Sequence, residues 1–187
     1  IMPSGLELTG LGAEARCMEC HQGRESGVSV NAAIDELALE SVDTVSEELG
    51  FKNIHYYAAA ATKYGTLAKG GYEYDFDTYD GNFAHVDGFE TCDSCHNSHT
   101  LELDIESCAT CHEDVAEGLN ELLLPAIQAY ANEVSGTPIG YGDGYPYFFI
   151  DANGDGEIGD DEGDRYNAWT PRLLKAAYNY QTAHKDP

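Results

Sequence analysis

Every cysteine of the chain lies in one of three copies of a five-residue pattern, Cys-x-x-Cys-His. In this pattern the two thiols form thioether bonds to a haem, and the histidine that follows becomes the proximal ligand of the iron. Since no cysteine is left over, the pattern predicts three c-type haems. The haem-binding cysteines would be Cys17 and Cys20 (motif 1), Cys92 and Cys95 (motif 2), and Cys108 and Cys111 (motif 3), with His21, His96 and His112 as proximal ligands.

Two other uses of paired cysteines fit this pattern less well. Zinc ribbons also contain Cys-x-x-Cys pairs, but they need no histidine directly after each second cysteine. Three disulfides would use six cysteines as well, yet a bridge across two residues is strained and redox-active rather than a structural staple. We therefore favour haem attachment over zinc binding and over disulfide formation.

Four histidines remain once the proximal ligands are assigned: His55, His85, His99 and His184. A lone histidine is more often a surface or hydrogen-bonded residue than a ligand. Three six-coordinate irons, however, need three distal ligands, so most of the remaining histidines have a use. We expect His55, His85 and His99 to be the distal ligands and His184, at a chain end where fraying is expected, to be the spare.

The proximal ligand also limits which haem His99 can reach. His96 holds the nearby backbone to the near face of its own haem, so we expect His99 to bind a neighbouring haem. Motifs 2 and 3 begin only 16 residues apart, which predicts that their haems are neighbours. The sequence leaves open which distal histidine belongs to which haem.

Six-coordinate haems would determine the kind of chemistry available. Two imidazoles on one iron leave no open site for a substrate, so such haems transfer electrons and we expect no enzyme activity. A module of a multihaem reductase would need one iron without a distal ligand, and the surplus of histidines argues against it. A structural calcium-dependent surface protein is a third alternative, but it leaves three haems without a role.

Residues 151–162 match the twelve-residue calcium-binding loop position by position. The expected ligands are side-chain oxygens of Asp151, Asn153 and Asp155, the main-chain carbonyl of Glu157 and both carboxylate oxygens of Glu162. The plain alternative is a solvated acidic turn. Because residues 144–150 look extended rather than helical, we expect a structural calcium clip and not an EF-hand that opens and closes.

Composition restricts the partners and the compartment. The chain has 34 acidic and 9 basic residues among 187, a formal net charge of −25, which argues against nucleic acid and anionic membranes as partners. No apolar run approaches the roughly 20 residues of a membrane helix. Residues 1–5 do not look like a secretory signal, yet c-type haem is attached outside the cytoplasmic membrane, so we expect an exported, already processed chain. An extracellular or cell-surface location is expected, with the periplasm as the alternative.

The remaining sequence predicts a mainly α, haem-organised fold with a large irregular content. Apolar periodicity predicts helices from Asn31 to Gly50, over about 53–64, over 114–134 with a bend at Pro125, and from Pro171 after Thr170 as cap. Alternating aromatic and polar residues predict a small β-hairpin over 72–81. We expect a single trihaem unit over 1–187 with three parts: 1–90 around haem 1 and distal histidines, 91–135 with haems 2 and 3 and the long helix, and 136–187 with aromatic residues and the calcium loop.

Several stretches resemble a family of exported bacterial multihaem c-type cytochromes. They are CHQGRES at 20–26, NIHY at 53–56, YGT at 64–66, AKG at 68–70, FAH at 83–85 and WTPRLLKAAYNY at 169–180. The resemblance spans nearly the whole chain. It implies bis-histidine haems and respiratory electron transport at or beyond the cell surface, and it supports His55 and His85 as ligands. Family chains often continue past a Lys-Asp-Pro like that at 185–187, so we expect a portion of a longer protein or a short member.

The resemblance also bears on partners. Some extracellular multihaem cytochromes polymerise into conductive filaments, and this analogy suggests a conduit whose partners are identical subunits or other redox proteins. A diffusible periplasmic carrier is the alternative. The sequence does not separate the two.

Overall fold

The computed structural model describes residues 1–187 except for 83–84, 110, 112–118, 160–162 and 186–187. In the part described, helices and irregular segments prevail, and the strands form one two-stranded sheet. Contacts divide the chain into two compact units: unit 1 comprises residues 1–28, 54–117 and 184–187, and unit 2 comprises 29–53 and 118–183. The sequence predicts three consecutive parts, 1–90, 91–135 and 136–187. That division differs from the two units and stays a prediction.

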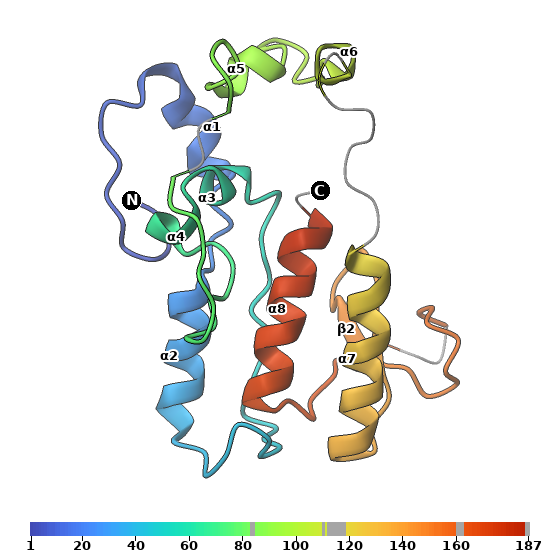
Figure 1. The fold of residues 1–187 in the computed structure, drawn as a ribbon. Coiled ribbons are helices and arrows are strands. Elements are labelled where there is room, and N and C mark those ends of the chain that lie inside the picture. The colour runs from blue at the N-terminus through green and yellow to red at the C-terminus, as the bar shows by residue number, and fades with distance from the viewer. Residues whose placement is uncertain (83–84, 110, 112–118, 160–162, 186–187) are drawn as a thin grey trace. The chain divides into compact units, whose positions relative to one another are not determined.

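Unit 1 consists of short helices joined by long irregular segments (Figure 1). Helix α1 contacts α3, and α3 contacts α4. The described buried apolar residues of this unit are few, and half of them are alanines: Met2, Met18, Ile54, Tyr72, Ala58, Ala60, Ala61 and Ala68. Unit 1 therefore has little bulky core of its own. Its helices are the 3-10 helix η1 (Gly12–Glu14), α1 (Ala15–Cys20), α3 (Ala59–Lys63), α4 (Gly65–Ala68), α5 (Cys92–Cys95) and α6 (Ile105–Cys108).

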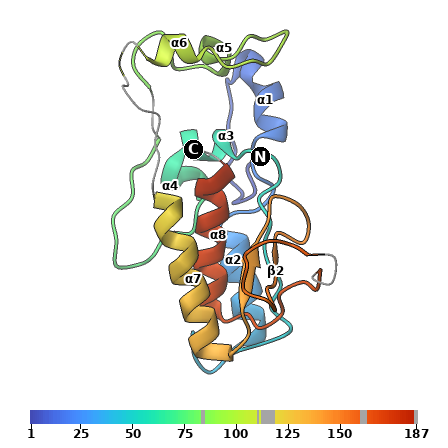
Figure 2. The same cartoon turned by 90° about the vertical axis from the view of Figure 1, so that its right-hand side faces the viewer.

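Unit 2 has longer helices than unit 1. It contains α7 (Leu119–Ser135), β1 (Ile139–Tyr141), β2 (Phe148–Ile150) and most of α2 (Gly27–Leu37) and α8 (Pro171–Lys185). The two strands are antiparallel, with Ile139 opposite Ile150. Within this unit α7 runs beside α8 in both views (Figures 1 and 2).

An aromatic cluster around Trp169 forms the core of unit 2. The Trp169 ring stacks on Phe51 at 5.7 Å between centroids, and Phe148 and Tyr166 meet it edge-on at 5.6 and 4.9 Å. The indole N–H donates to the carbonyl of Tyr166 at 2.9 Å, so the polar atom of this buried ring is satisfied. Unit 2 thus buries large aromatic side chains, in contrast to unit 1.

Helix α8 begins where the sequence predicts, with Thr170 as its cap. Pro171 is the first helical residue, and the hydroxyl of Thr170 accepts a hydrogen bond from the N–H of Leu173 at 3.1 Å. This bond satisfies one of the main-chain donors that a helix start leaves unpaired. Pro125 lies inside α7, as predicted, while residues 114–118 of the predicted helix lie outside the described part.

Two other predicted helices have wrong boundaries. Helix α2 begins before Asn31 and ends at Leu37, because Ala38 adopts the left-handed conformation with φ of +46°. The chain then turns irregular, and Ser46 donates from its N–H to the carbonyl of Trp169 at 2.8 Å. The predicted helix over 53–64 forms only as α3, since the N–H of His55 pairs with the carbonyl of Gly23 at 3.0 Å instead.

The hairpin predicted over 72–81 is wrong, since no strand forms there. The N–H of Tyr74 donates to the hydroxyl of Tyr79 at 3.0 Å, and the carbonyl of Asp80 accepts from the N–H of Thr66 at 3.0 Å. These bonds tie the segment to itself and to α4. The hairpin of the described part is β1–β2, and β2 lies in the stretch that the sequence marked as extended.

Candidate haem-binding site

Motif 1 occupies the end of α1. Cys17 and Cys20 are three residues apart on a helix, so their side chains point to one side. Both side chains are exposed. The carbonyl of His21 accepts from the N–H of Ala60 at 3.0 Å, which fixes the end of the motif to α3.

The imidazole of His21 has a defined orientation. Its Nδ1 lies 3.0 Å from the main-chain oxygen of Tyr57. A carbonyl only accepts, so Nδ1 carries the proton and the lone pair of Nε2 is available for a metal. Histidines that bind metals commonly hold their other ring nitrogen in this way.

Motif 2 forms the short helix α5. Thr91 precedes it, and the N–H of Thr91 donates to the hydroxyl of Ser94 at 3.2 Å, one half of a capping box. The Nδ1 of His96 lies 3.1 Å from the carbonyl oxygen of Leu101. As in motif 1, this bond leaves Nε2 available for a metal.

A tight loop after His96 supplies that carbonyl. The N–H of Leu101 donates to the main-chain carbonyl of Asn97 at 2.7 Å, and the N–H of Asp104 donates to the main-chain carbonyl of Cys95 at 2.9 Å. The loop therefore folds the chain back onto the motif and delivers Asp104 to the start of the next helix.

Motif 3 begins on α6. The Asp104 carboxylate caps this helix by accepting from the N–H of Ser107 at 3.4 Å and from its hydroxyl at 2.6 Å. Cys108 ends α6, and the side chain of Cys111 is exposed. His112, the predicted proximal ligand, lies outside the described residues.

The cysteines of different motifs are close enough to influence one another. Burial, then Glu14 and then Cys17 together raise the pKa of the Cys92 thiol to about 12, with burial as the largest cause. Burial also raises the pKa of Cys95, with Cys108 adding to the shift. Because such effects fall off with distance, Cys92 of motif 2 lies near Cys17 of motif 1, and Cys95 lies near Cys108 of motif 3.

The composition of unit 1 fits covalently bound haem. All six cysteines and all described histidines belong to unit 1, and unit 2 contains neither residue type. Large apolar side chains are exposed around the motifs, among them Tyr57 beside His21 and Leu101 and Ile105 after motif 2. A porphyrin bound at the motifs would cover such side chains and would supply the bulk that the alanine-rich core lacks.

The three predicted distal histidines also lie in unit 1. The backbone of His55 pairs with Gly23, two residues after His21. The His85 ring meets Phe89 edge-on at 6.0 Å, and the N–H of His99 donates to the side chain of Asn97 at 2.9 Å. Their coordination of iron stays a prediction.

His184 is placed differently from expectation. It lies in the last turn of α8, and the next residue, Lys185, donates from its ammonium to the carbonyl of Ile54 at 2.7 Å. The end of α8 is therefore tied down beside His55 rather than frayed.

The described part of the calcium loop, residues 151–159, has the turns that the pattern requires. Buried Asp151 accepts from the N–H groups of Gly154 at 2.8 Å and Gly156 at 3.1 Å, and both glycines have positive φ. Glu162 lies outside the described residues. Within the described part no group of three His, Cys, Asp or Glu side chains is arranged to hold a metal, so calcium binding stays a prediction.

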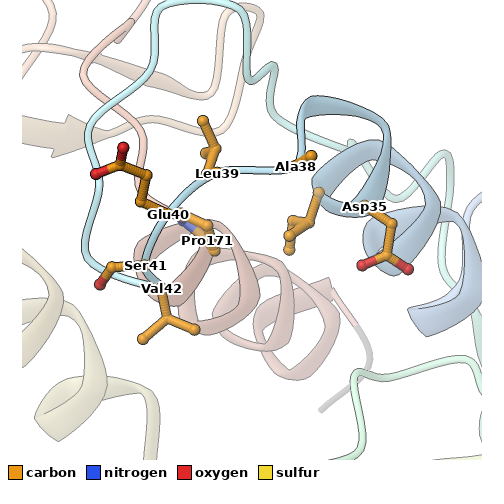
Figure 3. Close-up of a pocket in the computed structure, with 8 residues that line it drawn as sticks. Asp35, Ala38, Leu39, Glu40, Ser41, Val42 and Pro171 are labelled. Atoms are coloured by element: carbon orange, nitrogen blue, oxygen red, sulfur yellow. The ribbon is translucent and has the colours of Figure 1, made fainter.

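A shallow cavity of about 310 Å³ lies in unit 2, beside the end of α2 and the start of α8 (Figure 3). Aliphatic Ile34, Leu39 and Val42 line it together with Asp35 and Glu40. No cysteine or histidine lines it, so it offers no haem ligand.

Among the described residues no helix is long and apolar enough to cross a membrane.

Sequence reasoning missed the groups that orient the motifs. The carbonyls of Tyr57 and Leu101 left no signal, because any residue can supply a carbonyl. The helix caps did leave one: Thr91 and Asp104 each stand three residues before a serine, at the start of a Cys-containing helix. The ion pair between Glu14 and Lys63 was missed as well.

The chain is similar to larger multihaem proteins. It is 30% identical over 179 residues to the C-type polyheme cytochrome OmcB of Geobacter sulfurreducens, an alignment that covers 77% of this chain and 22% of OmcB. It is 28% identical over 189 residues to the C-type polyheme cytochrome OmcC of the same organism, covering 82% of this chain and 23% of OmcC. The chain thus spans less than a quarter of the curated relatives it matches. No family model and no solved structure matches it.

Proposed function

Since this chain is a multihaem c-type cytochrome related to OmcB and OmcC, we propose that it acts as a three-haem relay for single electrons. Cys17 and Cys20, Cys92 and Cys95, and Cys108 and Cys111 would hold the haems. When bound, each haem supplies an iron that alternates between the ferric and ferrous states. The residues of the chain attach the haems, ligate their irons and set their spacing.

One observation carries this proposal: His21 and His96 both have Nδ1 bound to a main-chain carbonyl, at 3.0 and 3.1 Å. Each ring is thereby prepared to bind iron through Nε2. The hydrogen bond also makes the imidazole a better electron donor, which favours the ferric iron and a low reduction potential. His112 would play the same part in motif 3.

We further propose that His55, His85 and His99 close the sixth position of the three irons. The supply of histidines supports this assignment, and a closed coordination sphere would make the protein a carrier and not an enzyme. Absorption and electron paramagnetic resonance (EPR) spectra test it. Low-spin ferric signals for all haems are expected, and a high-spin signal in the unaltered protein would point instead to a reductase module.

The calcium loop is the proposed second cofactor site. Asp151, Asn153, Asp155, the carbonyl of Glu157 and Glu162 would bind the ion as a structural clip. The turns at Gly154 and Gly156 support it, since they direct Asp151 into the loop. Extracellular calcium is abundant enough to fill even a weak loop of this type.

We place the relay outside the cell or at its surface, with other redox proteins or identical subunits as partners. Covalent haem and the calcium loop support export, and the charge of −25 suits a soluble surface that meets cations or a basic partner. Electron microscopy with and without a calcium chelator distinguishes the alternatives. Filaments would support a polymeric conduit, whereas discrete particles at every calcium concentration would favour a diffusible periplasmic carrier.

A further inference from the structure

The ammonium group of Lys63 connects the segments that carry motifs 1 and 2. It lies 3.0 and 3.2 Å from the two carboxylate oxygens of Glu14, directly before α1, and it donates to the carbonyl of Glu90 at 2.6 Å. Glu14 Oε1 also accepts from the N–H of Cys92 at 2.7 Å. Two side chains thus join the start of α1, the end of α3 and the first residue of motif 2.

This ion pair is better shielded than a typical surface pair. The Lys63 and Glu14 side chains are 24% and 13% exposed, against 53% and 45% for Arg172 and Asp43 in unit 2. Shielded pairs are screened less by salt, and hydrogen bonds between charged partners are stronger than neutral ones. The Glu14–Lys63 contact is therefore able to hold the start of α1, the end of α3 and the start of motif 2 in fixed positions.

Both groups keep their charge at neutral pH. Burial alone would raise the pKa of Glu14, but hydrogen bonds from Lys63 and the N–H of Cys92 outweigh it and lower the pKa below its ordinary value. Burial would lower the pKa of Lys63, but the Glu14 carboxylate outweighs it and raises the pKa. The ion pair thus persists across the physiological range.

The contact acts directly on the haem-binding cysteines. Glu14 directly precedes α1, the short helix that carries Cys17. Its carboxylate also accepts a hydrogen bond from the N–H of Cys92. Thioether bonds attach each porphyrin to its cysteines, so a shift of α1 relative to Cys92 would shift one haem against the other.

We infer that Glu14 and Lys63 are positioning residues that hold motif 1 against motif 2 and so set the contact between the first two haems. The inference rests on the proposed function. Across this contact one electron would pass between the two haems, so that one would be oxidised while the other is reduced. No bond forms or breaks, and neither Glu14 nor Lys63 gives up a proton.

The variants Glu14→Gln and Lys63→Met separate positioning from simple charge effects. Each breaks the ion pair, but the first removes a negative charge and the second a positive one. Charge alone would shift the potential of the nearest haem upward in Glu14→Gln and downward in Lys63→Met. Loss of positioning would act in the same direction in both variants.

The test is EPR spectroscopy of the oxidised protein, joined to a redox titration, after mass spectrometry has confirmed three haems per chain. We expect both variants to lose the magnetic interaction between the first two haems, which Lys63→Arg should retain. The matched control Asp43→Asn breaks the ion pair of unit 2, far from any cysteine in sequence, and should leave the interaction unchanged.

An interaction that survives in both Glu14→Gln and Lys63→Met would overturn the inference, as would potentials that move only in opposite directions. If Glu14→Gln does not retain three haems, the inference is tested with Lys63→Met and Lys63→Arg alone. A magnetic interaction of equal size in these two variants would overturn it. The proposed function is judged separately, by whether all three haems of the unaltered protein are reversibly reduced.

Discussion

The Nδ1 of His21 lies 3.0 Å from the carbonyl oxygen of Tyr57, a residue 36 positions later in the chain. This bond fixes the ring of the first predicted proximal ligand, and His96 forms its counterpart with Leu101. The two rings differ in the source of the carbonyl. For His96 a tight local loop supplies it, whereas for His21 it comes from the segment that also contains His55. The proposed first haem site would therefore depend on long-range packing.

Replacing a proposed distal ligand should open the sixth coordination position of one haem iron. We expect His55→Ala to produce a high-spin ferric EPR signal from one haem, because the sixth position of its iron would lose an imidazole. Added imidazole should restore the low-spin signal. The matched control is His184→Ala, which should leave the spectrum low-spin if His184 is the spare. A high-spin signal from His184→Ala, with none from His55→Ala, would exchange the two assignments.

Calcium should stabilise the protein through the loop at 151–162. A site at one hundred times its dissociation constant stabilises the folded state by about 2.7 kcal/mol, so chelation should lower the unfolding temperature measurably. Asp151→Asn should weaken calcium binding in isothermal titration calorimetry because it removes a charged ligand. Glu157→Gln is the control, since Glu157 contributes only its carbonyl. Equal binding by the parent chain and Asp151→Asn would rule out this loop as the site.

The sequence was most informative where a residue type has a specific chemical role. The cysteine motifs, the Thr170 cap with Pro171 and the extended stretch before the calcium loop were all predicted from local pattern, and the structure has the last two as expected. The haem motifs are supported by the homology and by the orientation of His21 and His96. Each of these signals lies within a few consecutive residues.

The errors arose where distant segments compete for the same backbone groups. The apolar positions of 31–50 suggested one helix, but Val42 and Val45 are 46% and 40% exposed while Leu49 is buried. Ser46 pairs with the backbone of Trp169, which periodicity cannot indicate. Likewise, Asp80 accepts a bond from Thr66 in place of a hairpin partner. The Glu14–Lys63 pair also joins residues far apart in the sequence.

Acid should weaken unit 2 through Asp43. Hydrogen bonds from Arg172 and Tyr130 lower the pKa of Asp43 from 3.8 to about 2. Because the folded pKa is depressed, the unfolded chain takes up this proton first, so the stabilising contribution is complete above pH 3.8 and is lost as pH falls toward 2. Acid titration followed by circular dichroism should show a shallower loss of stability over this range for Asp43→Asn. Salt should reduce the difference, since the pair is exposed.

Identical acid profiles for the parent chain and Asp43→Asn would contradict this assignment. Arg172→Met offers an independent check, because it returns the pKa of Asp43 toward its ordinary value while leaving the carboxylate in place. It should reproduce the shallower profile of Asp43→Asn.

Removing the haems should affect the two units differently. Unit 2 buries Trp169 among Phe51, Phe148 and Tyr166, whereas the described buried residues of unit 1 are half alanine. A full-length variant with all six cysteines replaced by serine cannot attach haem. We expect its only tryptophan, Trp169, to stay shielded from acrylamide quenching, because the core around it contains no haem ligand.

The control variant Trp169→Phe assigns the fluorescence signal. Amide hydrogen exchange by mass spectrometry should show fast exchange in α1, α3 and α5 of the cysteine-free chain, because the bound porphyrins would supply the bulk that unit 1 lacks. The segments of α7 and β1–β2 should stay protected. Fast exchange in both units would show that haem is needed for the whole chain to fold, and protection in both would show that unit 1 holds together without haem.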